Sequence, residues 1–581
     1  MITLIRLNTG MSSIMNQNPR YRNAKPITDD IRRHCHIFFD EGLFINALNF
    51  LIRILTVGAT TTTAIISQSG NTSNNHNRRN APPAFAPSPF HIELVSVLLI
   101  HPRYTNHAAI KEEYSEIASR SLVFLRCVLA ILGPINAKLG DAFSFNCDSI
   151  SRDLSEGNLN SAKLNLDEFT LRESDNSDDK NNQLKCGIAN HGRTRRCAKD
   201  FWQVVGWSFN CSLRYPERWK YLKVWLDYML DVLEADFQER ERLDLELTRL
   251  SSCLADEGQE HQLSKFLSKS LIVSHLSGVH GKSTAARRIV HSIFADGDKN
   301  SLKSFPQVFP NETKILKTSK GQSLRNKDWK SYFSTDYEQD FDVENFQLSP
   351  NYHLEEAEND FMSKDACVAT AESWMGGPEA VILRQRLINL LSNIAKKLPC
   401  FFIEYSYLQV LLYDFIRPLP LSVFSFFLSC SASSHISEVV YVSLCQMLLS
   451  RLLPRCAPNP TAFITNNDSI SQTVLEKCYL SFAALTSSSH DNATVSIIVE
   501  NLLRLLIKKK ACHYSTTLKS ALENGITARE EKIKKQRKRP LGNNFDEDAV
   551  LLKASGIRLR TLLSWLKKLS DRDDGDLLIS H

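Results

Sequence analysis

Residues 200–237, DFWQVVGWSFNCSLRYPERWKYLKVWLDYMLDVLEADF, carry the strongest structural signal in the chain. After Pro216, apolar side chains recur at steps of three and four, which places them on one stripe of an α-helix and predicts that the stripe faces a core. The stripe consists of Leu222, Trp225, Leu226, Met229, Val232, Leu233 and Phe237. Pro216 suits a first helical turn, and the alternating charges from Glu239 to Asp244 give no stop signal, so a long helix is predicted.

Four of the seven tryptophans fall in this region: Trp202, Trp207, Trp219 and Trp225. Flat aromatic rings can form a platform on which bases or peptides stack, or they can fill a core. Lys220 and Lys223 lie off the apolar stripe, whereas a stacking platform would have cations beside its rings. The spacing therefore favours core packing.

The chain as a whole predicts a mainly α fold, with irregular helical-repeat (α-solenoid-like) blocks and long disordered inserts. Helical spacing and polar, proline-rich gaps divide it into five expected segments. These are a flexible N-terminal tail (1–26), an N-terminal helical domain (27–295) with inserts at about 56–88 and 148–196, a basic-then-acidic disordered linker (296–373), a C-terminal helical domain (374–510), and a basic segment with a terminal helix (511–581). The helices share no repeat consensus, so the likeness is architectural and identifies no family.

Several helices have boundaries that can be tested. Gly133-Pro134 is expected to stop a helix that starts near residue 108. Beyond the linker, helices are expected at about Tyr405 to Ile416, Leu421 to Cys430, Ile436 to Leu453, Val474 to Leu485, Val495 to Leu506 and Val550 to Leu569.

The composition is that of a globular protein with a mild net charge of +6, so the bulk charge indicates no polyanionic partner. The 14 cysteines are scattered without short paired spacings, which predicts a reducing compartment. Charges and prolines interrupt the most apolar region, 401–430, so a soluble protein without membrane partners is expected. The basic start, acid-free up to Asp29, fits a flexible tail better than a mitochondrial presequence, because Asn, Gly and Pro would interrupt an amphipathic helix.

Segment 278–284 ends in GKST, which resembles the end of a phosphate-binding loop, where a lysine reaches the phosphates and a hydroxyl binds magnesium. The spacing departs from that motif, because Leu276 stands where the first glycine is required and Gly278 comes too late. An ordinary helix capped by Ser283 or Thr284 is the competing interpretation. A nucleotide-dependent enzyme built on this segment remains an alternative function.

No cofactor, metal ligand or catalytic residue is predicted. Cysteine and histidine gather at 34–36 and again at Cys186, His191, Cys197 and Cys211, but neither group has the short paired spacing of a zinc site. The sequence also lacks GxSxG and HExxH motifs. We therefore expect a protein that is not an enzyme.

The clearest targeting signal is the run 532–539, KIKKQRKR. Its basic residues are Lys532, Lys534, Lys535, Arg537, Lys538 and Arg539. A short polybasic run is typical of a nuclear import signal read by importin, or of a nucleic-acid contact; an exposed helix face is the competing interpretation. With the lysines at 508–510 it forms a basic segment, 508–539, that would bind phosphates in a salt-dependent way without reading bases.

These features predict a non-catalytic helical scaffold or adaptor subunit of a multiprotein assembly, located in the nucleus, with the cytoplasm as the alternative. Its expected partners are other proteins, importin through the basic run, and nucleic acid as a further candidate. The acidic segment 334–360, which contains aromatic residues, is a candidate tether for partners. A direct nucleic-acid-binding protein acting through 508–539 is the other alternative.

Overall fold

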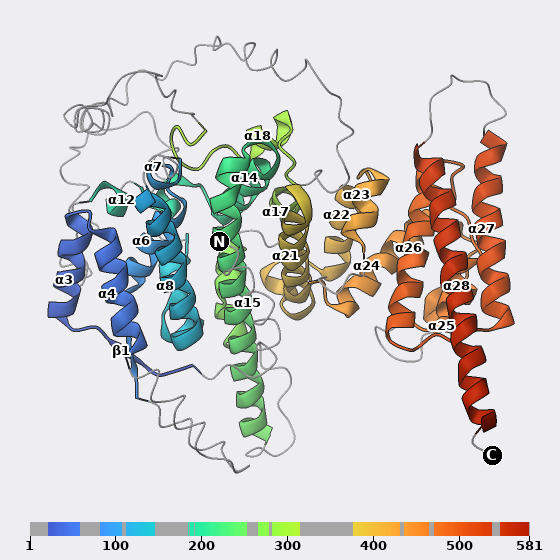
Figure 1. Ribbon diagram of the computed structural model, residues 1–581, viewed down its shortest axis with the longest axis horizontal. Coiled ribbons are helices and arrows are strands. Elements are labelled where there is room, and N and C mark those ends of the chain that lie inside the picture. Colours follow the sequence, from blue (N-terminus) through green and yellow to red (C-terminus); the bar gives the residue numbers. More distant parts are fainter. Residues whose placement is uncertain are drawn as a thin grey trace, which may run out of the picture. The chain divides into compact units, whose positions relative to one another are not determined.

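The structure is a computed structural model that describes twelve parts of the chain. They are residues 21–57, 82–106, 112–145, 184, 186–190, 192–252, 265–277, 282–313, 376–429, 435–463, 470–536 and 547–579. The chain divides into one compact unit, Met1–Glu312 with Ala371–His581, and a second, Thr313–Thr370, of which only Thr313 is described. In the described residues helices carry the fold, which confirms the mainly α prediction (Figure 1).

The N-terminal helices pack around α8. They are α3 (Asp29–Asp40), α4 (Phe44–Thr56), α6 (Pro89–Ile100), α7 (Pro102–Thr105), α8 (Glu112–Asn136) and α9 (Leu139–Phe143). α8 contacts α4, α6 and the long helix α15 (Pro216–Ser252). Every side chain of α6 from His91 to Ile100 is buried, as expected for a short helix that is apolar on all faces.

Among the described residues, α8 is the one helix long and apolar enough to cross a membrane, judged by length and composition alone. Its apolar side chains pack instead against neighbouring helices, which is typical of a core helix. The expected stop is present within it, because Gly133 has a φ of 70° and interrupts the helical geometry ahead of Pro134. Tyr21 lies so close to Gly133 that an added Cβ would be 2.4 Å from its ring, so only glycine fits there.

Two short parallel strands alter the expected segment limits. β1 (Ala24–Pro26) pairs with β2 (Ala84–Ala86), so the end of the expected tail and the end of the first expected insert are ordered together. The Arg22 guanidinium donates to the Pro82 and Val57 carbonyl oxygens, and so connects the residues before β1 to those before β2 and to the end of α4. The remaining residues of the tail, 1–20, and most of the insert, 58–81, lie outside the described residues.

Residues 200–237 belong to a helical hairpin that consists of α14 (Phe201–Arg214) and α15. The Asp200 carboxylate caps α14 by accepting from the Gln203 amide at 2.8 Å. α15 begins at Pro216, as predicted, and continues through the alternating charges to Ser252. The predicted apolar stripe, from Leu222 to Phe237, is buried.

The hairpin is followed by shorter helices that pack back on it. They are α16 (Leu271–His275), α17 (Ser283–Ile293) and α18 (Lys299–Ser304), with the 3₁₀ turn η4 (Leu267–Lys269); two further short helices, α12 (Gly187–Asn190) and α13 (Thr194–Cys197), precede it within the second expected insert. α18 and the residues up to Thr313 fall in the expected linker, yet Phe305, Phe309 and Glu312 are buried. The expected linker therefore starts with a packed segment, and 314–373 lies outside the described residues.

The helices after the linker begin with α21. They are α21 (Gly377–Lys397), α22 (Tyr405–Ile416), α23 (Leu421–Phe427) and α24 (Glu438–Leu452), with 3₁₀ turns η6 (Pro399–Phe401) and η7 (Pro460–Ala462). The predicted limits of α22 agree with the structure. Glu404 is the N-cap residue, and Pro418 follows the C-cap residue, Arg417. α21 packs against α15, where the Arg386 guanidinium bonds the carboxylates of Asp227, Asp231 and Glu234.

The last helices pack around α26. They are α25 (Gln472–Val474), the π-helix η8 (Leu475–Leu480), α26 (Ser489–Lys508), α27 (Thr516–Gln536) and α28 (Glu547–Ile579). α26 contacts α24, α27 and α28, so helices on both sides of the expected boundary at 510 share one core. The helix expected over Val474 to Leu485 is replaced by α25 and the wider π-helical turns of η8.

Three buried arginines bond the C-terminal ends of neighbouring helices. Arg218 donates to the carbonyl of Ile100, the last residue of α6. Arg384 donates to the Ile293 and Ala295 carbonyls at the end of α17, and Arg529 donates to the Leu480 and Phe482 carbonyls at the end of η8. A cation at a helix C-terminus satisfies carbonyls that lack an intrahelical partner and opposes the helix dipole.

Candidate functional site

The four tryptophans of residues 200–237 lie in the core. Trp202, Trp207, Trp219 and Trp225 expose between 2% and 7% of their surface. The Trp202 indole N–H donates to the His275 carbonyl at 2.8 Å, and the Phe201 ring stacks on the His275 ring at 4.5 Å. Rings enclosed in this way offer no free face to a base or a peptide.

The segment that resembles a phosphate loop has a different local structure. Leu271, Ile272 and Val273, which would have to form its strand, belong to helix α16. Lys282 is the N-cap of α17 and its side chain makes no capping hydrogen bond, so the expected cap by Ser283 or Thr284 is wrong. Residues 278–281 lie outside the described residues. The described part does not form the strand that precedes the loop in that motif.

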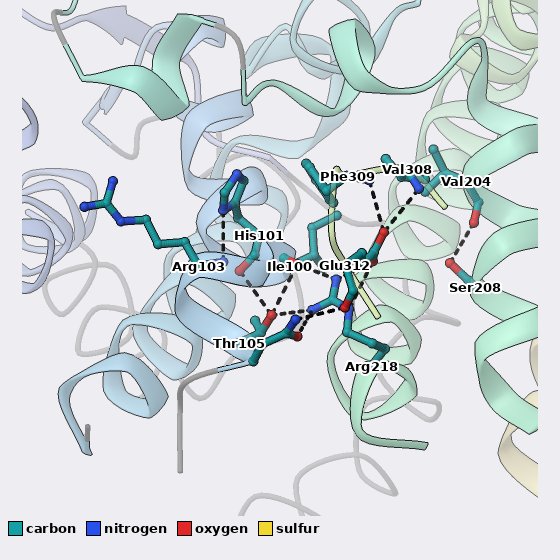
Figure 2. A network of polar contacts seen from close by, with 11 residues as sticks. Ile100, His101, Arg103, Thr105, Val204, Ser208, Arg218, Val308, Phe309 and Glu312 are labelled. Atoms are coloured by element: carbon teal, nitrogen blue, oxygen red, sulfur yellow. Dashed lines mark hydrogen bonds and ion pairs between the residues drawn. The ribbon is translucent and has the colours of Figure 1, made fainter. Parts of the chain in front are cut away.

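A buried polar network joins three parts of the N-terminal region (Figure 2). The Arg218 guanidinium on α15 contacts the Thr105 hydroxyl of α7 and the Glu312 carboxylate, and its Nη2 lies 2.8 Å from the Ile100 carbonyl oxygen. The other Glu312 oxygen accepts from the Val308 and Phe309 amides at 3.1 Å each. Arg218 and Glu312 expose 4% and 0% of their side chains, so the network fixes the segment after α18 to the end of α6.

Burial moves the pKa values of reactive side chains away from neutrality. It lowers the pKa of His91, His101 and His275 to about 3, so these rings are neutral at physiological pH. It raises the pKa of Cys35 to about 12 and that of Cys512 to about 11, which keeps these groups as thiols. Neutral imidazoles and protonated thiols in a core are poor proton carriers and poor nucleophiles.

A surface pocket of about 590 Å³ is lined by several polar groups, including Arg417, Ser488, His490 and Asp491. The His490 Nδ1 lies 3.3 Å from the Asp548 carboxylate, which is the contact expected in a catalytic relay. Its Nε2, however, lies 3.3 Å from the Arg417 carbonyl oxygen, and the Ser488 hydroxyl caps α26 by accepting from the Asp491 amide. The serine and histidine are therefore used to join helix ends rather than paired with each other.

The predicted basic run is divided by the structure. Lys532 lies within α27, and its ammonium group donates to the Ala484 carbonyl, so it is partly buried. Lys534 is exposed on the last turns of α27. The side chain of Lys535, and all of Arg537, Lys538 and Arg539, lie outside the described residues.

Lys508 and Lys532, which belong to the two clusters within the basic segment 508–539, lie near opposite ends of α26. Lys508 is the last residue of α26, and Lys509 pairs with Glu438 of α24. Lys532 contacts Ala484, whose amide donates to Asn492 in the first turn of α26 at 3.0 Å. A helix of 20 residues is about 30 Å long, so Lys508 and Lys532 do not belong to one patch.

The exposed face of α28 is a feature that the sequence analysis did not single out. Val550, Ile557 and Trp565 expose 49%, 63% and 47% of their surface, although α28 buries its opposite face against α26. These three lie within about 80° of one another around the helix, at 100° per residue. A helical wheel of the predicted helix would have found them as apolar residues on the far side from Leu552, Leu559 and Leu566.

The described residues contain no group of three or more His, Cys, Asp or Glu side chains able to hold a metal ion. Cys35 and Cys211, from the two groups weighed as zinc ligands, are buried as core thiols. No family model, curated protein or solved structure matches this chain.

Proposed function

We propose that this protein is a non-catalytic helical scaffold or adaptor subunit of a nuclear multiprotein assembly. The observation that carries the proposal lies on the C-terminal helices, where Lys534 is exposed on the last turns of α27 and exposed apolar side chains line α28. Basic runs are read by import receptors, and exposed apolar positions beside them are typical of protein-binding surfaces.

The distribution of reactive groups supports the non-catalytic part of the proposal. His91, His101, His275, Cys35 and Cys512 are held in their neutral forms by burial, which shifts their pKa values. The arginines Arg218, Arg384 and Arg529 are bonded to helix ends. These side chains stabilise the packing of helices, which suits a protein whose work is to present surfaces.

The test is purification of the tagged full chain from nuclear and cytoplasmic fractions of its own cells. The variant replaces Lys534, Lys535, Arg537 and Lys538 by alanine and leaves Lys532 intact, because Lys532 bonds the Ala484 carbonyl. A matched control replaces Lys508 and Lys510, which are exposed at the other end of α26.

We expect the parent and the control to enter the nucleus in a stable complex and the variant to remain cytoplasmic. Recovery of the parent as a partner-free monomer would contradict the scaffold proposal. Equal nuclear recovery of parent and variant would contradict the import signal. Steeply salt-dependent DNA or RNA binding, lost in the variant, would instead favour the direct nucleic-acid alternative.

A further inference from the structure

The exposed face of α28 combines aliphatic, aromatic and cationic side chains in separate rows. Val550 and Ile557 are seven residues apart, and Trp565 follows eight residues later, about 80° further round the helix, so together they form an apolar row. Lys553, Arg560 and Lys567 also repeat every seven residues, and at 100° per residue they lie on one flank of that row. The face therefore has the pattern of a helix surface that meets another helix.

The described side chains on and beside this face carry an excess of positive charge. The cations are Arg504, Lys553, Arg558, Arg560, Lys567 and Lys568. The carboxylates on and beside the face are fewer: Glu547 in the first turn of α28, Glu500, which pairs with Arg504 and Arg558, Glu523, which pairs with Arg560, and Glu530, which lies near Gly556. Among the described residues, Lys553, Lys567 and Lys568 have no carboxylate oxygen within 4.0 Å.

We propose that the α28 face, made of Val550, Ile557 and Trp565 with the flanking lysines, docks an acidic amphipathic helix of a partner protein. This inference deepens the proposed function and rests on it, since it names the chemistry of one partner. The apolar row would be covered by the partner's apolar stripe, and carboxylates beside that stripe would meet Lys553 and Lys567.

The charge distribution decides between this occupant and two others. A second copy of the chain would bring the same excess of cations against itself, which costs free energy at an interface. A nucleic acid would neutralise the lysines but would leave Val550 and Ile557 unburied, because aliphatic side chains make poor platforms for bases. An acidic amphipathic helix satisfies both rows at once.

The test measures binding of a designed probe to the purified full chain by fluorescence anisotropy. The probe is a 21-residue helical peptide (about three heptads) with leucine at the a and d positions and glutamate on both flanks, and its control carries lysine in place of each glutamate. We expect the acidic peptide to bind and the basic peptide not to bind. Added salt is expected to weaken the binding, because part of it is electrostatic.

Substitutions on the face sharpen the test. Ile557→Asp and Trp565→Ala are each expected to weaken binding of the acidic peptide by about tenfold or more. Lys553→Glu with Lys567→Glu is expected to weaken it and to admit the basic peptide. Val439→Asp is the matched control, since Val439 on α24 is an exposed valine away from α28 and its change is expected to leave binding unaltered.

Three results would overturn the inference: equal or absent binding of both peptides, displacement of the acidic peptide by duplex DNA, and sedimentation of the pure chain as a dimer that Ile557→Asp dissociates. Failure here is separable from failure of the proposed function. Nuclear recovery depends on residues 534–538, whereas peptide binding depends on the α28 face. If the chain assembles in the nucleus but does not bind the acidic peptide, only this inference is contradicted and the proposed function stands.

Discussion

In the N-terminal helices Arg218 meets both a helix end and a buried carboxylate, whereas in the C-terminal helices Arg529 meets carbonyl oxygens alone. Arg218 bonds the Ile100 carbonyl and pairs with Glu312. Arg529 bonds the Leu480 and Phe482 carbonyls, and its Nε and Nη2 have no hydrogen-bond partner. Burial lowers the pKa of Arg529 to about 10, so it still carries its charge at neutral pH.

The two regions therefore differ in how much stability the loss of an arginine costs. Removing one member of a buried ion pair leaves an uncompensated charge, whereas removing a cation that has no counter-ion leaves only unbonded carbonyl groups. The N-terminal region should therefore suffer more from loss of its arginine, although both residues do the same mechanical task of holding a helix end.

The largest expected effect is that of Arg218→Met. This substitution leaves the Glu312 carboxylate, which is 0% exposed, without its counter-ion. It should lower the free energy of unfolding by about 3–5 kcal/mol. Chemical denaturation of the full chain measures this. Adding Glu312→Gln to Arg218→Met should recover part of the loss, because the buried charge is removed while the amide oxygen still accepts from Val308 and Phe309. A double variant less stable than Arg218→Met would contradict the ion-pair account.

Acidification should distinguish the regions next. The folded-state pKa of His91, His101 and His275 lies near 3, below the ordinary value of 6.5, so the unfolded chain binds more protons between these two values. Their neutral forms contribute stability above pH 6.5, and it is lost as the pH falls. From pH 6.5 to 5 the loss is about 2 kcal/mol per histidine.

The half-buried carboxyl of Asp231 opposes this loss in part, because desolvation raises its pKa to about 6 and acid neutralises its charge. Three histidines should outweigh it. Tryptophan fluorescence reports the outcome, since four tryptophans lie in the N-terminal core. His275→Phe keeps the stacking on Phe201, removes one titrating ring and should move the acid transition to lower pH. An unmoved transition would show that another group controls acid unfolding.

Arg529→Met tests the C-terminal arginine in the same way as Arg218→Met tests the N-terminal one. It leaves the Leu480 and Phe482 carbonyls unbonded but removes a buried charge, so we expect a loss of about 1–3 kcal/mol. The loss should be smaller than that of Arg218→Met when both are measured under the same denaturant conditions. The reverse order would mean that Arg529 has an anionic partner that neutralises it.

The smallest expected effects separate two lysines of the basic run. Lys532→Ala removes the bond to Ala484 and should cost about 1 kcal/mol. Lys534→Ala, on the exposed side of α27, should change stability by less than about 0.5 kcal/mol. Thermal melts of the two variants measure the difference. Equal melting temperatures would show that the Lys532 contact adds nothing to the fold.

Periodicity was sufficient to predict the helices with one clear apolar face. α15 starts at the predicted proline and buries the predicted stripe, and the kink at Gly133 lies where the helix was expected to stop. The strands β1 and β2 could not be predicted, because each has three residues and their pairing joins positions 60 residues apart. The packed segment from Phe305 to Glu312 looked like linker, because the residues that it contacts are far away in sequence: Phe305 packs against Gly206, and Glu312 pairs with Arg218.

Among the candidate functional residues, some could also be predicted from helical spacing, whereas the role of others depends on contacts with residues far away in sequence. The exposed apolar row on α28 follows from helical spacing alone and was within reach of the sequence. The structural role of Lys532 was not, because its acceptor, Ala484, is 48 residues away in sequence. Likewise, the lysines at 508–510 are close in sequence to the basic run, and only the antiparallel course of α26 and α27 separates them.

The contact of Tyr21 with Gly133 sets a limit on any trimming of the N-terminus. The Arg22 amide donates to the Ile131 carbonyl, and the Arg22 carbonyl accepts from the Asn136 side chain, so residues 21 and 22 close the broken end of α8. A protease that cuts before Tyr21 would leave these bonds in place. A cut after Pro26 would remove the partner strand of β2 and the Tyr21 ring that covers Gly133, so N-terminal cleavage preserves this packing only where it falls before Tyr21.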